Sequence, residues 1–206
     1  MELTGLLLCA GLSARMGYNK TLLNYNNSSF ISNILFKMNR VCSKLIVVTG
    51  YQHKIISKAI NEDESLKPFI DKVTVVENEN YIKGMFTSLK QGIKEIDSGY
   101  ILYHFVDNPS LPLNFYIDFQ MQVNKNNNWF QPVFGGKKGH PIIIDDFVAK
   151  LILAEDENSN LKSLSLNNHI KKFYWVCDYP EILYDIDTPA DYKMLKNEDE
   201  HIRKNY

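Results

Sequence analysis

The sequence predicts an α/β domain built on a mostly parallel, doubly wound sheet. In the first half of the chain, near-continuous apolar runs of strand length alternate with amphipathic stretches of helical period. Strands that are apolar on both faces are typical of a sheet that helices cover on both sides. The 206 residues, of which 45% are hydrophobic, suffice for a single core. We therefore assign residues 1–196 to one domain and residues 197–206 to a polar C-terminal tail.

Four apolar runs are the predicted strands of the first half, and they span residues 3–10, 45–49, 73–76 and 100–106. Between them, apolar residues recur at helical spacing, at positions 31, 34, 35 and 38 and again at positions 86, 89, 93 and 96. The predicted order is therefore β-α-β-α-β-α-β. Parallel strands joined by right-handed crossovers leave a ligand crevice beyond their carboxyl ends, so we expect functional residues there.

The second half predicts a small antiparallel insertion. Residues 129–134 and 141–144 have the composition of strands, and they flank a glycine-rich turn at 135–139. A helix over residues 147–152 and a strand over 173–176 follow. Near the end of the chain, Thr188 precedes Pro189 and an acid, Asp191, lies three residues after the threonine, which is typical of a helix start.

Charge and cysteine content exclude several classes of function. Lys and Arg total 23 against 24 Asp and Glu, so no overall positive field favours a nucleic acid or an anionic membrane as partner. The three cysteines are far apart and form no CxxC motif, which predicts buried thiols rather than disulfides or a zinc site. No apolar run reaches the roughly 18 residues of a membrane span. We expect a cytoplasmic protein.

The loop after the first predicted strand is the most informative segment. It contains Gly11, Ser13, Arg15, Gly17 and Lys20, and it matches neither the Walker A loop nor the dinucleotide-binding fingerprint. Glycines allow backbone amides to approach a phosphate, and Arg and Lys supply positive charge on either side. The chain otherwise uses lysine for most of its basic residues, so the arginine at position 15 suggests a site that needs a planar, bidentate donor. A solvated loop with exposed basic residues is the alternative.

This loop resembles the signature of the MobA-like nucleotidyltransferases, and most closely that of the molybdenum cofactor cytidylyltransferases. The matching residues are Leu8-Cys9-Ala10-Gly11, Ser13, Arg15-Met16-Gly17 and Lys20. Further family motifs follow in order, at Asn80, Gly84-Met85, Ser88, Asp107, Pro109, Gly139-His140-Pro141 and 185–189. The resemblance implies a three-layer α/β/α, Rossmann-like fold of the nucleotide-diphospho-sugar transferase type, and transfer of a nucleotidyl group to a phosphorylated acceptor.

The resemblance also implies roles for individual residues. Backbone groups of Leu8, Cys9, Ala10 and Gly11 contact the base, and Ser13, Gly17, Asn80, Gly84 and Ser88 complete the nucleotide site. Arg15 neutralises the β- and γ-phosphates, and Lys20 stabilises the α-phosphate. Asp107 holds Mg²⁺ together with Asp185 or Asp187, with Asp185 favoured as the direct ligand. Without the resemblance, a turn is the favoured interpretation of Asp107, and a helix cap is the favoured interpretation of the later pair.

The acceptor side departs from the family pattern. By resemblance, Gly139, His140, Pro141 and Asp156 lie beside the acceptor, but the segment 155–160 keeps only the Asp of a family motif and lacks its glycines and its arginine. The expected substrates are an NTP, with CTP favoured over GTP, and molybdopterin. A sugar 1-phosphate acceptor is one alternative. Another is a non-catalytic accessory protein that binds molybdenum cofactor and delivers it to a molybdoenzyme client.

Overall fold

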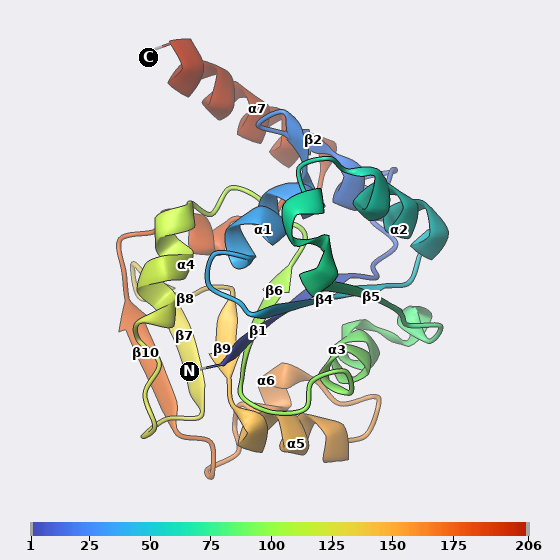
Figure 1. Ribbon diagram of the computed structural model, residues 1–206. Helices are drawn as coiled ribbons and strands as arrows, with labels where there is room; N and C mark the ends of the chain where they lie inside the picture. Colours follow the sequence, from blue (N-terminus) through green and yellow to red (C-terminus); the bar gives the residue numbers. More distant parts are fainter. Residues whose placement is uncertain (1, 205–206) are drawn as a thin grey trace.

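A mixed β-sheet forms the middle layer of the molecule, with helices on both faces (Figure 1). The computed structural model describes residues 2–204, with side chains for residues 2–197. The strands of the main sheet are β1 (Leu3–Cys9), β4 (Lys44–Thr49), β5 (Val73–Glu77), β6 (Tyr100–Phe105), β7 (Trp129–Phe134), β8 (Lys137–Lys138), β9 (Ile142–Ile144) and β10 (Lys172–Val176). The strands β2 (Asn24–Tyr25) and β3 (Ser28–Ser29) form a separate short hairpin.

The strand order confirms the predicted doubly wound sheet. It runs β10-β7-β9-β6-β1-β4-β5, and every neighbouring pair on this path is parallel except those that include β9. The antiparallel insertion is also present, with one difference from a simple hairpin. The glycine turn joins β7 to the short β8, and β9 then enters the sheet between β7 and β6. This insertion extends the sheet beyond β6.

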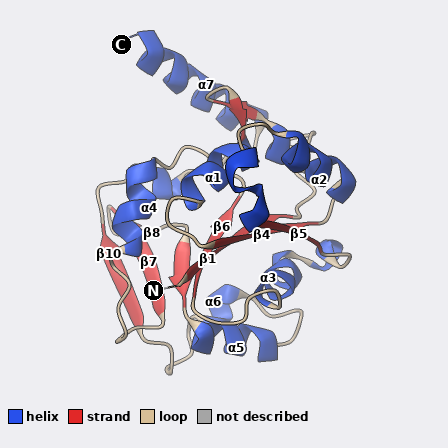
Figure 2. Cartoon of the chain, in the orientation of Figure 1, coloured by secondary structure: helices blue, strands red, loops and turns tan. Residues whose placement is uncertain are grey.

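The helices are α1 (Phe30–Met38), α2 (His53–Glu62), α3 (Met85–Ile93), α4 (Leu113–Gln120), α5 (Asp146–Ala154), α6 (Leu161–Leu164) and α7 (Pro189–Lys204). Figure 2 shows them on the two sides of the strands. Short 3-10 helices span Lys20–Leu22, Lys67–Lys72, Tyr81–Lys83 and Pro180–Leu183. The sequence analysis missed α4 and α6, because each is short and is stabilised by packing rather than by a strong local pattern.

The alternation of side chains along β1 divides the core into two layers. Leu7 packs with α1, α2 and α4 on one face, and Leu6 and Leu8 pack with α3 and α5 on the other. All seven residues of β1 are buried, which explains its continuous apolar pattern. Gly92 allows α3 to pack closely on the second face, since a Cβ there would lie 2.2 Å from Leu6 Cδ1. The close packing fixes the start of α3 beside the carboxyl end of β1.

The C-terminal helix α7 begins at the predicted position. Thr188 Oγ1 accepts a hydrogen bond from the Asp191 amide, and the Asp191 carboxylate accepts one from the Thr188 amide, so the two residues form a capping box. The helix runs to Lys204 and projects from the body (Figure 1). Residues 197–204, which we placed in the polar tail, therefore continue this helix, and residues 205 and 206 lie outside the described part. The domain boundary stays a prediction.

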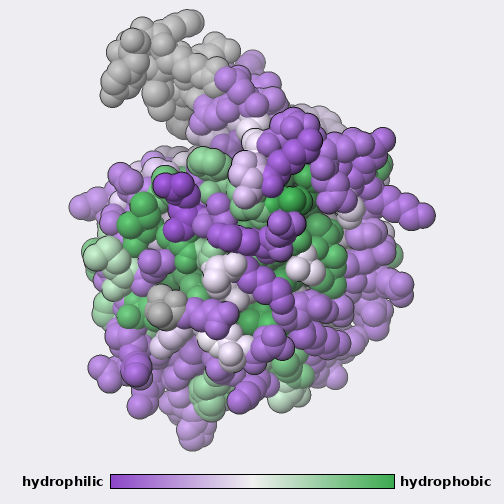
Figure 3. Space-filling model, in the orientation of Figure 1, coloured by the Kyte–Doolittle hydropathy of each residue, from purple (hydrophilic) through white to green (hydrophobic). Residues whose placement is uncertain are grey.

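The cysteines are buried thiols, as predicted, and the surface is mostly hydrophilic on the face shown in Figure 3. Cys9, Cys42 and Cys177 are buried and form no disulfide. On the face that Figure 3 shows, hydrophilic residues cover most of the surface and apolar residues appear in patches between them. Within the described residues, the helices are all too short or too polar to cross a lipid bilayer.

From the burial of His104 we predict that the protein loses stability in acid. It is fully buried in β6, where its Nε2 lies 2.8 Å from Tyr116 Oη, and burial lowers its pKa from 6.5 to about 3. Between these values the unfolded chain binds a proton that the folded chain does not, so the unfolding free energy decreases as the pH falls. We expect urea unfolding, followed by circular dichroism at pH 7 and pH 5, to show a smaller pH effect for His104→Gln than for the wild type. Equal pH effects would contradict this origin.

Candidate functional site

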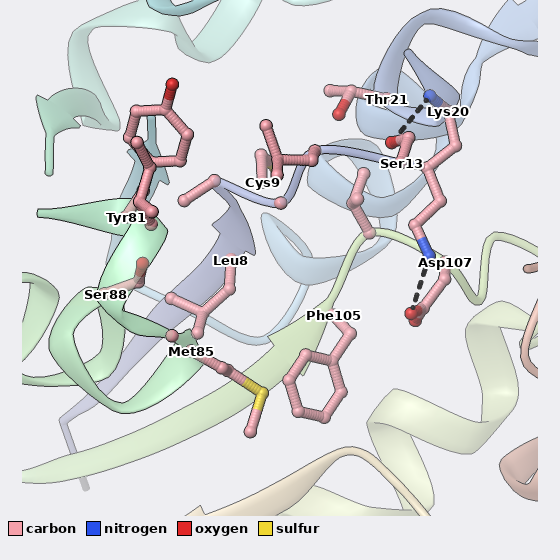
Figure 4. Close-up of a pocket in the computed structure, with 16 residues that line it drawn as sticks. Leu8, Cys9, Ser13, Lys20, Thr21, Tyr81, Met85, Ser88, Phe105 and Asp107 are labelled. Carbon is pink, nitrogen blue, oxygen red and sulfur yellow. Dashed lines mark hydrogen bonds and ion pairs between the residues drawn. The ribbon is translucent and has the colours of Figure 1, made fainter. Parts of the chain in front are cut away.

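A pocket of about 300 Å³ opens where the carboxyl ends of β1 and β6 meet. After β1 the chain builds the sheet in one direction through β4 and β5, and β6 then starts the other half on the opposite side of β1. Such a reversal leaves a crevice beyond the strand ends, as the sequence analysis expected. The lining residues are Leu8, Cys9, Ala10, Gly11, Leu12, Ser13, Lys20, Thr21, Tyr81, Ile82, Gly84, Met85, Ser88, Phe105, Val106 and Asp107. Figure 4 shows Lys20 and Asp107 on one side and Tyr81, Met85 and Ser88 on the other.

Lys20 is the centre of the charged side of the pocket. Its ammonium lies 3.1 Å from Asp107 Oδ2 and 2.9 Å from Asp187 Oδ1. The second oxygen of Asp187 lies 2.8 Å from a guanidinium nitrogen of Arg15. Burial lowers the pKa of Lys20, but the two carboxylates outweigh burial and raise the pKa above its ordinary value. The structure thus brings together four predicted residues from three distant segments, and Lys20 is a cation near neutral pH.

The backbone around Asp107 is fixed by three hydrogen bonds from other segments. The Ile186 amide donates to the Asp107 carbonyl at 3.0 Å, Asn108 Nδ2 donates to the Glu181 carbonyl at 2.6 Å, and Lys37 Nζ donates to the Pro109 carbonyl at 2.6 Å. The carboxylate itself is only partly engaged. Asp107 Oδ1 is buried and has no hydrogen-bond partner within the described part of the chain. A held carboxylate with one unused buried oxygen is suited to bind a cation.

Asp185 lies near the same cluster but outside its ion pairs. Partial burial of the carboxyl raises its pKa, and the negative charges of Asp107 and Asp187 raise the pKa further. Asp187 instead faces Lys20 and Arg15, and the capping of α7 falls to Thr188 and Asp191. Among residues with described side chains, no group of three or more acidic, His or Cys side chains is close enough together to hold a metal ion. Asp107, Asp185 and Asp187 are therefore not placed to hold one ion all three together.

The loop between β1 and Lys20 has an unusual backbone that forms an open hollow. Ser13 and Gly17 have φ values of 51° and 78°, in the region that favours glycine. The buried Met16 anchors the loop, and Ser13 Oγ accepts a hydrogen bond from the Lys20 amide at 3.3 Å. The loop thereby borders a second hollow of about 380 Å³, next to the first pocket, which is lined by Leu12, Ser13, Ala14, Gly17, Tyr18, Asn19, Tyr51 and Gln52.

The opposite side of the pocket is the start of α3. Gly84 lies at the N-terminus of the helix with φ 121°, as predicted, and Ser88 lies one turn further on with its side chain in the pocket lining. Asn80 is exposed and does not line the pocket, in contrast to its predicted place. Sequence reasoning missed Asn78, which is buried and hydrogen-bonded to Ser88. An asparagine that directly follows a strand and lies near a predicted site is a signal, although a weak one.

His140 and Gly139 lie beside the pocket rather than in it. His140 stacks edge-on against Phe105, with ring centroids 4.8 Å apart, and Phe105 lines the pocket. Burial lowers the pKa of His140 to about 4, so the imidazole is neutral near pH 7, and its Nδ1 is buried without a partner in the described part of the chain. Gly139 packs closely against Ile182, since a Cβ would lie 2.5 Å from the Ile182 carbonyl oxygen. Pro141 follows His140 through a cis peptide bond.

A third hollow, of about 390 Å³, borders His140. It is lined by Trp129, Gln131, Lys138, His140, Ile142, Leu161, Lys162, Ser165, Leu166, Lys172 and Tyr174. Lys138 Nζ lies 2.9 Å from Tyr174 Oη and 4.3 Å from the centre of its ring. Asp156 does not line this hollow. It is exposed, and its Oδ1 accepts hydrogen bonds from the amide and the side chain of Asn158.

Comparison with known proteins assigns the fold and the family. The family model of the MobA-like NTP transferase domain matches residues 5–171. The chain belongs to the MobA-like NTP transferase family. It is therefore a nucleotidyltransferase, as the sequence resemblance predicted.

Two relatives and one solved structure show the extent of the similarity. The molybdenum cofactor cytidylyltransferase of Escherichia coli (strain K12) is 24% identical over 193 residues, which are 93% of this chain and 94% of that protein. A probable molybdenum cofactor guanylyltransferase of Bacillus mycoides (strain KBAB4) is 23% identical over 136 residues, which are 65% of this chain and 63% of that protein. The structure of a nucleotidyl transferase from Methanothermobacter thermautotroptrophicus superimposes with a TM-score of 0.79 at 18% identity, covering 98% of this chain and 99% of the other.

Replacing Lys20 in this MobA-like transferase tests the cluster that its ammonium forms with Asp107 and Asp187. Lys20→Met leaves Asp107 and Asp187 without their shared ammonium, and we expect thermal unfolding on the order of 5 °C lower. Millimolar Mg²⁺ should restore part of the loss, because a divalent cation can replace the missing charge. Differential scanning calorimetry with and without Mg²⁺ measures both effects. The control is Lys83→Met, which removes an exposed pair with Glu157 and should change little. An unchanged melting temperature in Lys20→Met would rule out the cluster as a stabilising contact.

Proposed function

We propose that this chain is a Mg²⁺-dependent cytidylyltransferase that transfers CMP from CTP to a phosphorylated acceptor and releases pyrophosphate. The observation that carries the proposal is the position of Lys20 and Asp107 at one end of a pocket at the switch point of the sheet. The cytidylyltransferase relative, similar over nearly its whole length, supports CTP as the nucleotide. The guanylyltransferase relative, similar over less of its length, makes GTP the competing substrate.

The reaction needs positioning and charge stabilisation rather than a protein nucleophile. A phosphate oxygen of the acceptor attacks the α-phosphorus of the NTP, the bond from the α-phosphorus to the bridging oxygen breaks, and pyrophosphate leaves with that electron pair. Lys20 is the cation beside the pocket, and it donates hydrogen bonds to the α-phosphate. Arg15 is 72% exposed, so its guanidinium can turn from Asp187 toward the β- and γ-phosphates in the hollow next to the loop. Backbone groups of Leu8–Gly11 contact the base.

The residues fit a bound Mg²⁺ ion. The buried Asp107 Oδ1 lacks a partner in the described part of the chain, and a magnesium ion takes one or two carboxylates with water and phosphate oxygens. Asp107 would hold the ion together with Asp185, since Asp187 is already paired with Lys20 and Arg15. When bound, the ion neutralises charge on the triphosphate. Lys20 and Arg15 orient the phosphates, and the hydrogen bonds around residues 107–109 hold the carboxylate in place.

The acceptor site in this proposal is the lysine-lined hollow next to His140. Lys138, Lys162 and Lys172 provide positive charge for a phosphate, and Trp129 and Tyr174 provide aromatic surface for a ring. This combination suits a phosphorylated heterocycle such as molybdopterin better than a sugar 1-phosphate, which offers no flat ring. His140 is neutral, so its unpartnered Nδ1 contributes a hydrogen bond and not a charge. A cytoplasmic location and a molybdoenzyme client complete the proposal.

A non-catalytic accessory role is the second candidate. The altered segment 155–160 favours it, because Asp156 is hydrogen-bonded within its own turn and lines none of the three hollows described above. The presence of Arg15, Lys20 and Asp107 in one cluster argues against it, since an accessory protein has no need of an ammonium and a free carboxylate oxygen at the α-phosphate position. We therefore favour catalysis.

The catalytic assignment predicts loss of turnover without loss of fold. Lys20→Ala and Asp107→Ala should each lower pyrophosphate release from CTP by at least about a hundredfold, because each removes preorganised charge at the reacting phosphate. Pyrophosphate detection with CTP, GTP, UTP and ATP, Mg²⁺ and molybdopterin measures this, and circular dichroism checks the fold. The exposed variant Lys83→Ala is the control. Turnover like that of the wild type in either variant would remove the residue from the mechanism, and NTP binding without release in the wild type would favour the accessory role.

The acceptor hollow predicts separate effects on the two substrates. Lys138→Met and Lys162→Met should each raise the KM for the phosphorylated acceptor about tenfold, through loss of a charge-assisted contact, and leave CTP binding unchanged. Steady-state kinetics with varied acceptor, together with calorimetric titration of CTP, distinguishes the two. Lys137→Met is the matched control, since Lys137 precedes Lys138 on β8 but does not line the hollow. An equal increase in KM for Lys137→Met would indicate a general charge effect instead.

A further inference from the structure

Gln52, which precedes α2, has a backbone conformation that residues with a side chain rarely adopt. Its φ and ψ values are 57° and 34°, in the left-handed region that favours glycine. Hydrogen bonds on both sides hold it there. The Gln52 carbonyl accepts from the Ile55 and Ile56 amides at 3.0 and 3.1 Å, and the Tyr51 amide donates to the Ala10 carbonyl at 3.3 Å. A costly conformation persists only where its surroundings enforce it, which makes the Gln52 side chain a candidate for a function.

The Gln52 side chain holds Asn19, which lies 33 residues earlier in the chain. Asn19 Nδ2 donates to Gln52 Oε1 at 2.9 Å, and the Thr21 amide donates to Asn19 Oδ1 at 2.9 Å. Since a backbone amide can only donate, the second contact turns Asn19 Oδ1 toward Thr21, and Asn19 Nδ2 then needs the oxygen of Gln52 as its acceptor. Asn19 and Gln52 both line the second hollow. Their contact joins the loop after β1 to the start of α2.

Asn19 in turn fixes the backbone from which Lys20 projects. It is the N-cap of the 3-10 helix Lys20–Leu22, and the Lys20 amide itself donates to Ser13 Oγ at 3.3 Å. Figure 4 shows Lys20 between Ser13 and Asp107. The contact with Ser13 is long for a hydrogen bond, whereas both contacts of the Asn19 side chain are of ordinary length. The firmer attachment of this turn therefore runs through Asn19 and Gln52 to α2.

We propose that Gln52 is a positioning residue for Lys20, which it places by holding Asn19 against the start of α2. The inference rests on the proposed function, because it concerns the place of the Lys20 ammonium at the reacting α-phosphate. A displacement of about 1 Å at such a position can lower the rate of the chemical step up to a hundredfold. Nucleotide affinity depends on many other contacts and changes less. The left-handed backbone of Gln52 lowers stability and is kept because its side chain serves catalysis.

Two substitutions of Gln52 separate the effect of its side chain from that of its backbone. Gln52→Gly and Gln52→Ala both lose the amide group, but only the glycine relieves the left-handed conformation. We expect Gln52→Gly to melt about 3 °C above Gln52→Ala. Both variants should nevertheless show the same loss, about tenfold, in the single-turnover rate of pyrophosphate formation, with a CTP affinity within about threefold of the wild type.

Three measurements on the full chain give these quantities. Differential scanning calorimetry gives the melting temperatures, and calorimetric titration of CTP with Mg²⁺ gives the affinity. Rapid mixing with CTP, Mg²⁺ and molybdopterin, followed by pyrophosphate detection, gives the single-turnover rate. A residue with a structural role alone would make the rate follow the melting temperature, so Gln52→Gly would be faster than Gln52→Ala.

Further variants show whether Gln52 acts through Asn19. Asn19→Ser keeps an oxygen that can cap the 3-10 helix but is too short to reach Gln52, so it should lower the rate as Gln52→Gly does. Adding Gln52→Gly to Asn19→Ser should lower the rate no further. Asn27→Gly is the matched control, because Asn27 is exposed, has a φ of 63° and lies in the turn between β2 and β3. It should keep the rate of the wild type.

The outcomes distinguish the inference from the function on which it rests. A wild-type protein that forms no pyrophosphate from CTP, GTP, UTP or ATP would overturn the proposed function and the inference with it. An active wild type whose rate is unchanged in Gln52→Gly, or is lost in Gln52→Ala alone, would overturn the role of Gln52 and leave the function standing. A lower rate in the double variant than in Asn19→Ser would show that Gln52 acts by another route, and would also overturn the proposal.

Discussion

The Lys20 ammonium between Asp107 and Asp187 is the contact on which the organisation of the site depends. It joins the loop after β1, the end of β6 and the segment before α7, and Lys20 and Asp187 are 167 residues apart in the chain. The two acids repel each other and Asp185, and the cation between them offsets that repulsion. In the proposed function, the same side chains contact the triphosphate and the metal ion. The same charges therefore hold the segments together and serve the proposed function.

The sheet was predictable from the sequence because its signal is local. The seven buried residues of β1 repeat an apolar pattern that only a strand covered on both faces requires, and the strands around it share that pattern. The helix α4 was not predictable in the same way. Its aromatic residues, such as Phe115 and Phe119, pack against Trp175 on β10, and that contact depends on the completed sheet. The same holds for the position of β9 between β6 and β7.

The part of the candidate site that lies on the loop after β1 could be predicted from the sequence. Gly11, Ser13 and Lys20 lie in the pocket because a single β-strand and the turn after it place them there. The partners of the acids could not be derived, since they follow from the meeting of the β1 loop with the segment before α7. Asn78 was missed for a related reason: its hydrogen bonds to Thr87 and Ser88 depend on where α3 packs. Spacing predicts which residues are near a site and not which hydrogen bonds they make.

The two ends of the pocket differ in how their polar side chains are held. One end has ion pairs that include an exposed arginine, and the other has buried hydrogen bonds. In the proposed function the phosphate end exchanges partners, because Lys20 and Arg15 are paired with acids here and would turn to the triphosphate, and Arg15 is 72% exposed. The opposite end of the pocket holds its polar side chains in hydrogen bonds within the protein instead. Asn78, Thr87 and Ser88 are accordingly buried and bonded to one another. An exposed guanidinium at one end and a buried hydrogen-bond chain at the other suit a site that exchanges ligands at its phosphate end alone.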